Sequence, residues 1–415
     1  MANDTKISVK YEFKTDVWES YDGHEQRRCL RQIPRRTVSY DYTSMNALEA
    51  QWLRAQIRKK QSTFDFIPMW HDTAYLESDF YGGKTIYIEE DFMSGFENCD
   101  AIEIFYHDDV MNHTGANVTK KVKSYFGNTI NLKTPLDATL LASNTKVVPL
   151  IRCSTPETAS FSYIYSNGSN VTISFEDIMF KTQMEIDGKY TYQYNFADII
   201  GFNRYNLPLT VANKEVLLNE PQWVDDDSHT LSVSKNVVRL DNTSGIFKYD
   251  LKNSNSYDTH QTTFLLRSKR MINNMVKFFK HVKGRFKSFY APSWVNDFEV
   301  AFDIKNGTNY INVELSEMYR YYLNNGRKKK IVIFTKGYKS YIVDIMSYSY
   351  DTINNKDYGR LVLATSFPVY IRKEDVCMVS FFNLVRLDSD EMTINFETVD
   401  VATVELVMKE VDDLL

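Results

Sequence analysis

The sequence predicts a mainly β protein of the α+β type, built from two tandem β-barrel or sandwich domains that each carry one packed amphipathic helix. Three observations lead to this prediction. The 415-residue chain contains 28 Tyr and 26 Phe but only 15 Gly and 9 Pro, and aromatic side chains favour a pleated, half-buried surface. Its length allows two or three domains with sizeable cores. A strand–helix–strand pattern also occurs twice.

This pattern occupies residues 35–70 and again residues 259–294, and the two stretches align without a gap. Few residues are identical, so the match depends on the order of the features. Each copy opens with alternating apolar side chains, represented by Tyr40 in the first copy and Phe264 in the second. Side chains alternate between the two faces of a strand. We therefore expect Tyr40 and Phe264 in equivalent core positions.

A helix follows the opening strand in each copy. Ser268 is a residue of the type that caps helix N-termini, and in the first copy Ser44 or Asn46 takes this role. Apolar residues then recur at the i, i+4, i+7 spacing that places one stripe against a core. The stripe contains Leu48, Trp52 and Ala55 in the first copy and Ile272, Val276 and Phe279 in the second.

Each copy closes with an aromatic strand that ends in Pro-x-Trp. Proline at this place is typical of a strand end or an edge strand. We expect the tryptophan in the core, although an exposed tryptophan would also suit stacking on a sugar. The closing residues are Pro68 and Trp70 in the first copy and Pro292 and Trp294 in the second.

A second similarity extends the repeat. Residues 171–176 (VTISFE) resemble residues 392–397 (MTINFE), and this match follows the first one in the same order. The rest of each half is rich in strand-like segments. We therefore predict two domains of common origin: residues 1–185, which include an N-terminal arm, and residues 186–415.

Parts of both copies resemble virion proteins of long-tailed bacteriophages. The similarity is strongest at residues 15–72, which begin with TDVWESYDGHEQRR, and at residues 259–298, where a helix ending in Lys-Gly-Arg leads into SFYAPSW. The resemblance implies a tail-tube-like β fold. It further implies a structural subunit of the distal tail or baseplate, in a ring that links the tail tube to tip or fibre proteins and surrounds the DNA channel.

On this resemblance, the expected partners are further copies of the chain in a trimer or hexamer ring, together with tail tube, hub and fibre proteins. DNA would pass transiently through the ring. Three chains with two like domains each present six similar surfaces, so a threefold ring can dock on a sixfold tube. Closing a ring also pairs edge strands that would otherwise be exposed. The expected location is the virion tail, after assembly in the cytoplasm of the host bacterium.

Five arginines near the N-terminus are candidates for the contact between subunits. Arginine forms bidentate bonds with carboxylates, so the cluster would pair with acidic residues of a neighbouring chain. Local ion pairs on a solvated arm are the alternative, and contact with DNA phosphates is a third. The cluster consists of Arg27, Arg28, Arg31, Arg35 and Arg36.

We expect no catalytic residues, no cofactor and no metal site. The sequence contains no Gly-rich phosphate loop, GxSxG or HExxH motif. Residues 107–113 and 225–229 contain metal-ligand residue types but match no established spacing. We also expect no membrane insertion, because no apolar stretch has the length of a membrane helix, and no signal peptide, because the first residues have no apolar core.

Two rival functions stay open. A carbohydrate-binding adhesion module of the virion would use exposed aromatic side chains to hold a host glycan. A glycan-degrading tail enzyme would need two carboxylates roughly 5–9.5 Å apart in a cleft. A ring subunit differs from both because it assembles as an oligomer, and its functional surfaces are interfaces rather than a pocket.

Overall fold

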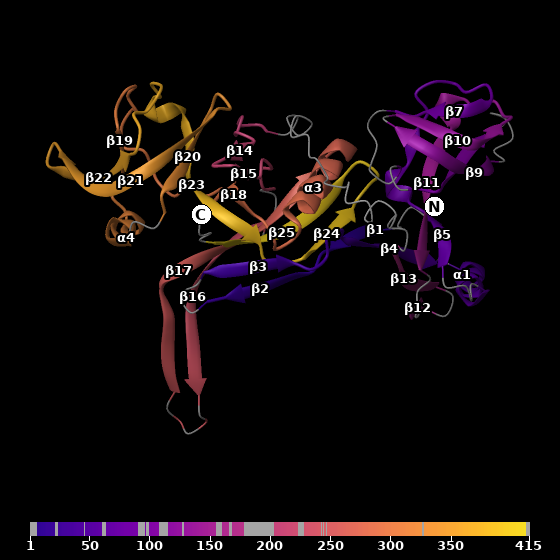
Figure 1. Ribbon diagram of the computed structural model, residues 1–415, viewed down its shortest axis with the longest axis horizontal. Coiled ribbons are helices and arrows are strands. Elements are labelled where there is room, and N and C mark those ends of the chain that lie inside the picture. Colours follow the sequence, from indigo (N-terminus) through magenta and orange to yellow (C-terminus); the bar gives the residue numbers. More distant parts are fainter. Residues whose placement is uncertain are drawn as a thin grey trace.

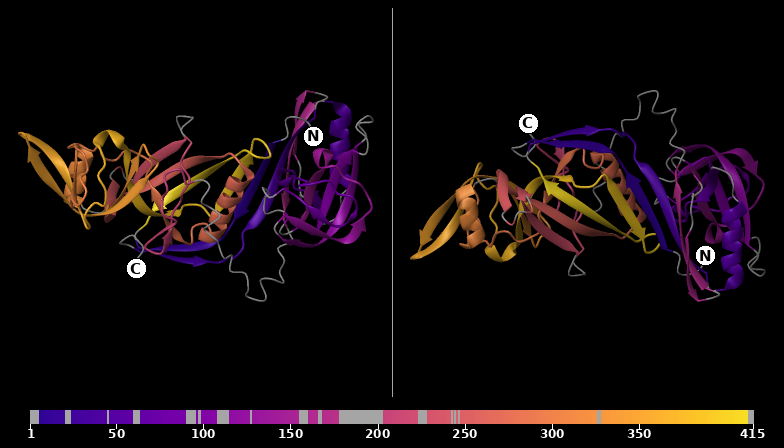
Figure 2. Two further views of the ribbon diagram at one scale, coloured as in Figure 1. Left: turned by 90° about the horizontal axis from the view of Figure 1, so that it is seen from above. Right: turned by 90° about the horizontal axis from the view of Figure 1, so that it is seen from below.

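Antiparallel sheets form most of the protein, as expected for a mainly β chain. In the computed structural model (Figure 1), two β-rich lobes lie at opposite ends of a long central sheet, and a hairpin projects from that sheet. Views from above and below show the same elongated arrangement (Figure 2). No described helix has the length and apolar character needed to cross a membrane. The structure describes residues 6–20, 24–44, 46–59, 64–89, 96, 99–107, 115–126, 128–154, 160–165, 168–177, 203–222, 228–241, 243, 245, 247–325 and 328–411.

We call the strands of the amino-terminal half the first unit. Four of them follow the order β12-β13-β4-β1, and six follow the order β5-β11-β8-β9-β10-β7. A bridge between Cys153 and Asp177 connects the two groups. The strands are β1 (Lys6–Glu12), β4 (Arg35–Ser44), β5 (Phe64–Pro68), β7 (Gly83–Tyr87), β8 (Ala101–His107), β9 (Gly115–Phe126), β10 (Thr129–Leu136), β11 (Lys146–Ser154), β12 (Ser160–Tyr165) and β13 (Gly168–Glu176).

The strands of the carboxy-terminal half form the second unit. Four of them follow the order β24-β25-β17-β16, and six follow the order β18-β23-β20-β21-β22-β19. Pairing between β23 and β25 joins the two groups. The strands are β16 (His229–Asp241), β17 (Phe247–Leu266), β18 (Ser288–Pro292), β19 (Tyr310–Val313), β20 (Lys330–Thr335), β21 (Ser340–Ile353), β22 (Lys356–Leu363), β23 (Val376–Leu387), β24 (Glu391–Phe396) and β25 (Ala402–Glu410).

The two units therefore have the same strand order, both along the chain and across the sheets. Their pairing registers agree as well. Pro68 of β5 lies opposite Leu150 of β11, and Pro292 of β18 lies opposite Phe382 of β23. β11 also pairs with β8, and β23 also pairs with β20. Counting the same number of residues along β11 and β23 from these prolines' partners gives residues that lie opposite equivalent positions of β8 and β20.

The predicted equivalence of residues 171–176 and residues 392–397 is wrong by one strand. Residues 171–176 lie in β13, which pairs with Tyr40 and its neighbours on β4. In the second unit, Phe264 and its neighbours on β17 pair with β25, so β25 is the counterpart of β13. Residues 392–397 fall instead on β24, the counterpart of β12. Both segments alternate between apolar and polar residues, and this period alone does not distinguish neighbouring strands of one hairpin.

Shorter elements lie outside this repeated order. An N-terminal hairpin of two strands forms the arm, and two further short strands precede the second unit. These elements are β2 (Thr15–Glu19), β3 (Glu25–Cys29), β6 (Ala74–Tyr75), β14 (Thr210–Val211), β15 (Lys214–Glu215), and the 3-10 turns η1 (Trp70–Asp72), η3 (Ala142–Asn144) and η5 (Lys373–Asp375). The helices are α1 (Ala47–Lys59), α3 (Lys269–Val282) and α4 (Glu317–Asn325).

Helix α3 lies in the central core, as its sequence stripe predicts. Ile272 and Phe279 are both 0% exposed and pack among strands of both units. The helix begins at Ser268, whose hydroxyl accepts a hydrogen bond of 3.2 Å from the Met271 amide. It ends at Lys283 in the left-handed conformation, followed by Gly284 at a φ of +61°. These caps satisfy the free backbone groups at the helix ends.

Helix α1 contradicts the prediction for the first copy. Leu48 is 77% exposed and Trp52 is 62% exposed, so neither belongs to a core. The helix contacts β4 and β13 through its other side, where Ala50 is buried. Its N-terminus is capped by Asn46, whose side-chain oxygen accepts a hydrogen bond of 2.9 Å from the Glu49 amide.

The remaining core candidates divide between the two units. Tyr40 and Phe264 are buried at equivalent positions of β4 and β17. Pro292 and Trp294 are buried in the second unit, whereas Pro68 and Trp70 of the first are half-buried. The expected domain boundary between residues 185 and 186 lies outside the described residues.

Candidate interaction surfaces

The two units meet edge to edge. Strand β1 of the first unit pairs antiparallel with β24 of the second, and the ladder sets Val9 opposite Ile394 and Tyr11 opposite Met392. All four side chains are buried. The join therefore combines main-chain hydrogen bonds with a row of apolar cross-strand pairs, which are the main stabilising contacts of a sheet. One continuous sheet runs through both units.

The counterparts of the joined strands lie at the two outer ends of this row. In the described part of the chain, β16 pairs with β17 alone and β12 pairs with β13 alone. Phe161 of β12 lies opposite Val171, as Phe396 of β24 lies opposite Ala402. An unpaired strand edge presents backbone donors and acceptors to any strand that can add to it. Both outer edges are therefore candidates for contact with another chain.

The hairpin of β16 and β17 extends beyond the sheet (Figure 1). Its projecting part carries apolar side chains that are well exposed, among them Leu240 at 54% and Tyr249 at 63%. Arg239 lies over the Phe247 ring with its guanidinium carbon 4.3 Å from the ring centroid. An exposed, apolar projection of this kind is typical of a segment that a partner covers.

The predicted arginine cluster is divided by the structure. Arg36 is 6% exposed and donates two hydrogen bonds, of 3.1 and 2.7 Å, to one carboxylate oxygen of Asp177. This residue is therefore committed inside the first unit and is not available to a neighbouring chain. Arg28 and Arg35 are exposed.

The other two arginines of the cluster hold the arm in place. Arg27 donates to the backbone oxygen of Phe286 in the second unit at 3.1 Å. Arg31 forms an ion pair of 3.0 Å with Glu12. The structure thus favours local contacts for Arg27, Arg31 and Arg36 over pairing with another subunit.

Sequence reasoning missed a buried ionic contact between the arm and the second unit. Arg386 donates to both carboxylate oxygens of Glu25 at 2.6 and 2.9 Å, and Lys409 lies 3.2 Å from the same carboxylate. Burial alone would raise the pKa of Glu25, but the Arg386 guanidinium and the Lys409 ammonium together outweigh it and hold the pKa below its usual value. No local signal predicts a contact between residues 361 positions apart.

Asp390 is a second anchor of the arm. Its carboxylate accepts hydrogen bonds from the Thr15 amide at 2.6 Å and from the Arg285 amide at 2.9 Å. A side chain at Gly284 would place its Cβ 2.6 Å from this carboxylate. The Lys-Gly-Arg turn therefore needs glycine both for its left-handed backbone and for the close approach of Asp390.

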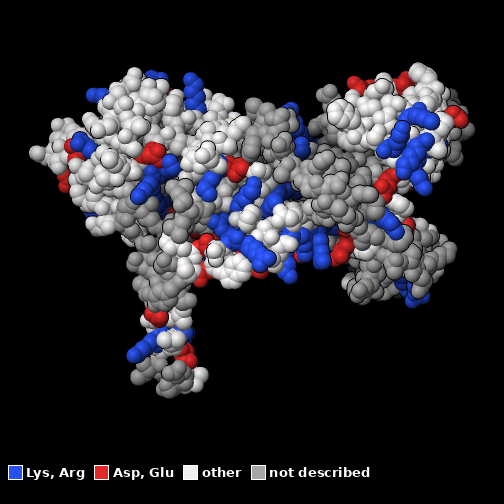
Figure 3. Space-filling model, in the orientation of Figure 1, with Lys and Arg blue, Asp and Glu red and all other residues white. Residues whose placement is uncertain are grey.

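Basic side chains gather along the middle of one face, over the β2–β3 hairpin and the strands beside it (Figure 3). Lys14, Arg28 and Arg35 are exposed residues of this stretch of chain. The net charge of the whole chain is −5, so this face differs in sign from the molecule as a whole. It is a candidate surface for acidic partners.

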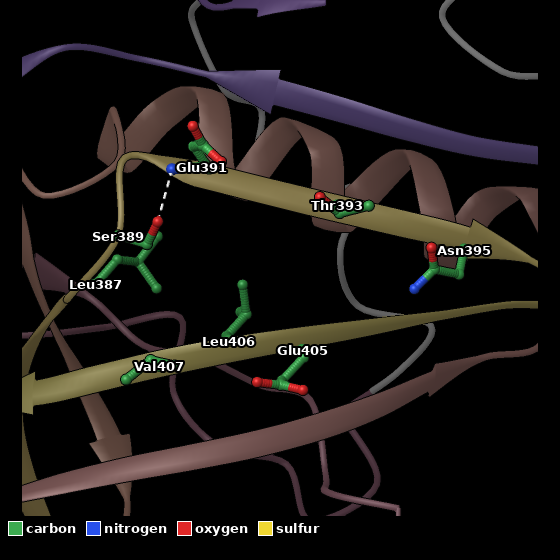
Figure 4. A pocket seen from close by; sticks show the side chains of 8 residues that line it. All are labelled: Leu387, Ser389, Glu391, Thr393, Asn395, Glu405, Leu406 and Val407. Carbon is green, nitrogen blue, oxygen red and sulfur yellow. Dashed lines mark hydrogen bonds between the residues drawn. The ribbon is translucent and has the colours of Figure 1, made fainter. Parts of the chain in front are cut away.

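A polar slot opens where β24 and β25 diverge (Figure 4). The two strands pair only between Ile394–Phe396 and Ala402–Val404. The slot contains two carboxylates, and both have partners: Glu391 lies 3.7 Å from Lys10, and Glu405 accepts a hydrogen bond of 2.6 Å from Gln261. These exposed, paired acids resemble sheet-surface contacts more than an acid–base pair in a cleft.

A second cavity, of about 550 Å³, lies on the first unit beside Trp70. The Trp70 and Phe105 rings form one wall, with centroids 5.0 Å apart. Polar side chains complete it. Residues that line this cavity, which we call the Trp70 pocket, include Trp70, Tyr75, Phe105, Tyr106, Asn117 and Lys146.

Within the described residues, no group of three or more His, Cys, Asp or Glu side chains is placed to hold a metal ion. Most of the two clusters at residues 107–113 and 225–229 lies outside the described residues. Neither a scan against models of protein families nor a search of the curated proteins finds a match for this chain.

Proposed function

We propose that this chain is a structural subunit of a bacteriophage tail. It forms a ring at the distal tail or baseplate, links the tail tube to tip or fibre proteins, and surrounds the channel through which DNA leaves. The observation that carries this proposal is the edge-to-edge join of two units with the same strand order. The resemblance of residues 15–72 and 259–298 to virion proteins is the reason for proposing a phage tail as the location.

The join within the chain is a template for joins between chains. Strand β1 meets β24, and their counterparts β16 and β12 are left at the two outer edges. If β16 of one chain pairs with β12 of the next, the same contact repeats around the assembly. Such a head-to-tail contact closes into a ring when the rotation between successive units divides a full turn, and otherwise makes a filament.

Two units per chain suit the expected symmetry. Three chains supply six units of one strand order, so a trimer presents six similar faces to a sixfold tube. The proposal includes a common origin of the two units, with a domain boundary near residue 185. It also assigns the outer strand edges, rather than the arginine cluster, to the contact between subunits.

The test is the oligomeric state of the purified chain, measured by light scattering after gel filtration and by native mass spectrometry. We expect a closed trimer or hexamer whose mass stays constant as concentration rises, and a ring in electron micrographs. A chain that stays monomeric at the highest concentrations would contradict the proposal.

Two matched variants locate the contact. Tyr163 on β12 is 51% exposed and Tyr87 on β7 is 50% exposed, and each lies on an outer strand. A lysine on an edge strand disfavours the addition of another strand. We expect Tyr163→Lys to lower the oligomeric mass and Tyr87→Lys to leave it unchanged. Equal effects of the two variants would rule out β12 as the contact.

The tail location requires a separate measurement. Cryo-electron microscopy of the intact particle should locate the chain at the distal end of the tail tube. The rival carbohydrate-binding module predicts instead a monomer with saturable binding to a glycan array, and that result would replace the ring proposal.

A further inference from the structure

We infer that the Trp70 pocket of the first unit binds a peptide segment of a partner protein, which packs an aromatic side chain against the Trp70 and Phe105 rings. The inference comes from the second unit, where the equivalent place is already filled by such a segment. It does not depend on the ring.

The two places are equivalent by strand register. Phe105 of β8 lies opposite Lys146, four residues before Leu150, the partner of Pro68. Phe334 of β20 lies opposite Met378, four residues before the partner of Pro292. Each phenylalanine ring also packs against the tryptophan of its Pro-x-Trp, in a tilted arrangement for Trp70 and a stacked one for Trp294. The ring centroids are 5.0 Å apart for Trp70 and Phe105 and 5.2 Å apart for Trp294 and Phe334.

In the second unit, a segment that precedes the unit in sequence covers this aromatic pair. The Tyr205 ring lies 4.8 Å from Phe334 and 6.3 Å from Trp294, measured between centroids. Leu207 and Leu218 pack in the same cluster. Trp294 is consequently 2% exposed and Phe334 is 0% exposed.

This segment turns at Tyr205 and again in the β14–β15 hairpin, and hydrogen bonds to the second unit hold it on both sides of that hairpin. The Leu217 amide donates to the Tyr290 oxygen at 2.9 Å, beside a parallel bridge between Val216 and Tyr290 at the free edge of β18. The Ser340 hydroxyl donates to the Asn206 oxygen at 3.3 Å. At Val216 and Leu217 the contact resembles strand addition, in which main-chain bonds hold a peptide at a strand edge, and the turn at Tyr205 places its ring in a side-chain pocket.

The first unit has the same aromatic wall with an open cavity above it. Trp70 and Phe105 are only half-buried, and the cavity holds about 550 Å³. Phe66 of β5, the counterpart of Tyr290, is 44% exposed, so β5 offers the edge that β18 offers to Val216. Asn117 occupies the place of Ser340 and supplies a polar side chain beside the pocket.

The surroundings indicate what the peptide contains. Glu103 and Lys146 of the first unit stand where the second has Val332 and Met378. Both units thus have the same contact between a tryptophan and a phenylalanine ring, but the side chains around it are charged in the first unit and apolar in the second. A partner segment with one tyrosine or phenylalanine flanked by polar and charged residues fits this combination better than a wholly aliphatic one.

The test uses a peptide of residues 203–211 (NRYNLPLTV) of this same chain as a probe, added to the intact protein. We expect saturable binding by calorimetry at one site per chain. The matched peptide with alanine in place of the tyrosine should bind at least tenfold more weakly. No saturable binding of the tyrosine peptide at millimolar concentration would overturn the inference.

Protein variants locate the site. Phe105→Ser removes one wall, and Ala116→Trp fills the cavity from its rim, so each should weaken the peptide at least tenfold. Tyr81→Ser changes a 77% exposed aromatic of the same unit and serves as the control with unchanged binding. Thermal unfolding of each variant shows that it is folded. Peptide binding unaffected by both pocket variants, or binding of oligosaccharides in its place, would refute the assignment.

Discussion

The two units share a strand order but differ in how they bury what that order brings together. Helix α3 presents Ile272 and Phe279 to a core built from both units, whereas α1 turns Leu48 and Trp52 to solvent. Trp294 is covered and Trp70 is half-open. The comparison teaches that the pattern of strands determines the topology, while the neighbours of each unit determine which faces become core.

A buried polar position shows the same difference. Arg36 on β4 forms an ion pair with Asp177, and the counterpart of Arg36 on β17 is His260, which lies opposite Met408. Both side chains are buried. One sheet position thus contains a permanent charge with a partner in the first unit and a neutral ring in the second.

The largest difference in the loss of unfolding free energy is expected between substitutions in α3 and in α1. Phe279→Ala removes a fully buried ring and should lower the free energy of unfolding by about 3–5 kcal/mol. Trp52→Ala removes an exposed ring and should change it by about 0.5 kcal/mol or less. Denaturant titration of both variants checks this, and similar losses would show that the helices are equally buried.

The buried ion pair gives the next prediction. Arg36→Met removes the buried positive charge that faces the Asp177 carboxylate and should cost about 3–5 kcal/mol of unfolding free energy. The double variant Arg36→Met with Asp177→Leu should recover most of this loss, because no uncompensated charge is left. A double variant as unstable as the single one would mean that the charge itself is not the cause.

The histidine at the equivalent position predicts a dependence on pH. Burial, together with the nearby Lys328 charge, lowers the pKa of His260 to about 4, and Asp258 and His229 also act on it. The unfolded chain has a histidine pKa of about 6.5 and binds more protons between these values. Stability is therefore complete above pH 6.5 and falls, by up to about 3 kcal/mol, as the pH drops towards 4.

His260→Phe should remove this part of the pH dependence. The measurement is the free energy of unfolding between pH 7.5 and pH 4 for both proteins, compared as a difference that cancels the other titrating groups. His71 in the first unit has its pKa lowered to about 3 by burial, with Arg36 adding to the effect, so its contribution remains in the variant. Parallel curves would contradict the assignment to His260.

The smallest expected effect concerns the helix caps. Ser268→Ala removes the hydroxyl that accepts from the Met271 amide and should cost about 1 kcal/mol. Asn46→Ala removes the matching cap of α1 but should cost less, because α1 contributes little buried surface to the fold. Thermal unfolding of the two variants measures this difference. A larger loss for Asn46→Ala would reverse the comparison.

Much of the local structure was predictable. The alternation around Tyr40 and Phe264, the cap at Ser268 and the order of strand, helix and strand all follow from short-range patterns. The prediction for α1 was wrong because its sequence supports two inward faces, one through Leu48 and Trp52 and one through Ala50. Which face meets the sheet depends on where β4 and β13 lie, and periodicity carries no information about that.

The candidate interaction surfaces were harder to predict from the sequence. The five arginines were visible as a cluster, but only the folded chain shows that Arg36 is buried with Asp177 and that Arg27 reaches the second unit. The outer edges of β12 and β16 are ordinary strands in sequence. They become candidate contact surfaces only because β1 pairs with β24, a contact between the two ends of the chain.

The sequence by itself determined the mainly β character, the repeated order of elements and the helix caps, because backbone geometry and side-chain alternation act over a few residues. Tertiary structure alone decided which helix is buried, which tryptophan is covered and which strand edges stay open. Burial depends on surfaces supplied by distant parts of the chain, and among the described residues only the second copy has a neighbouring segment that covers its tryptophan.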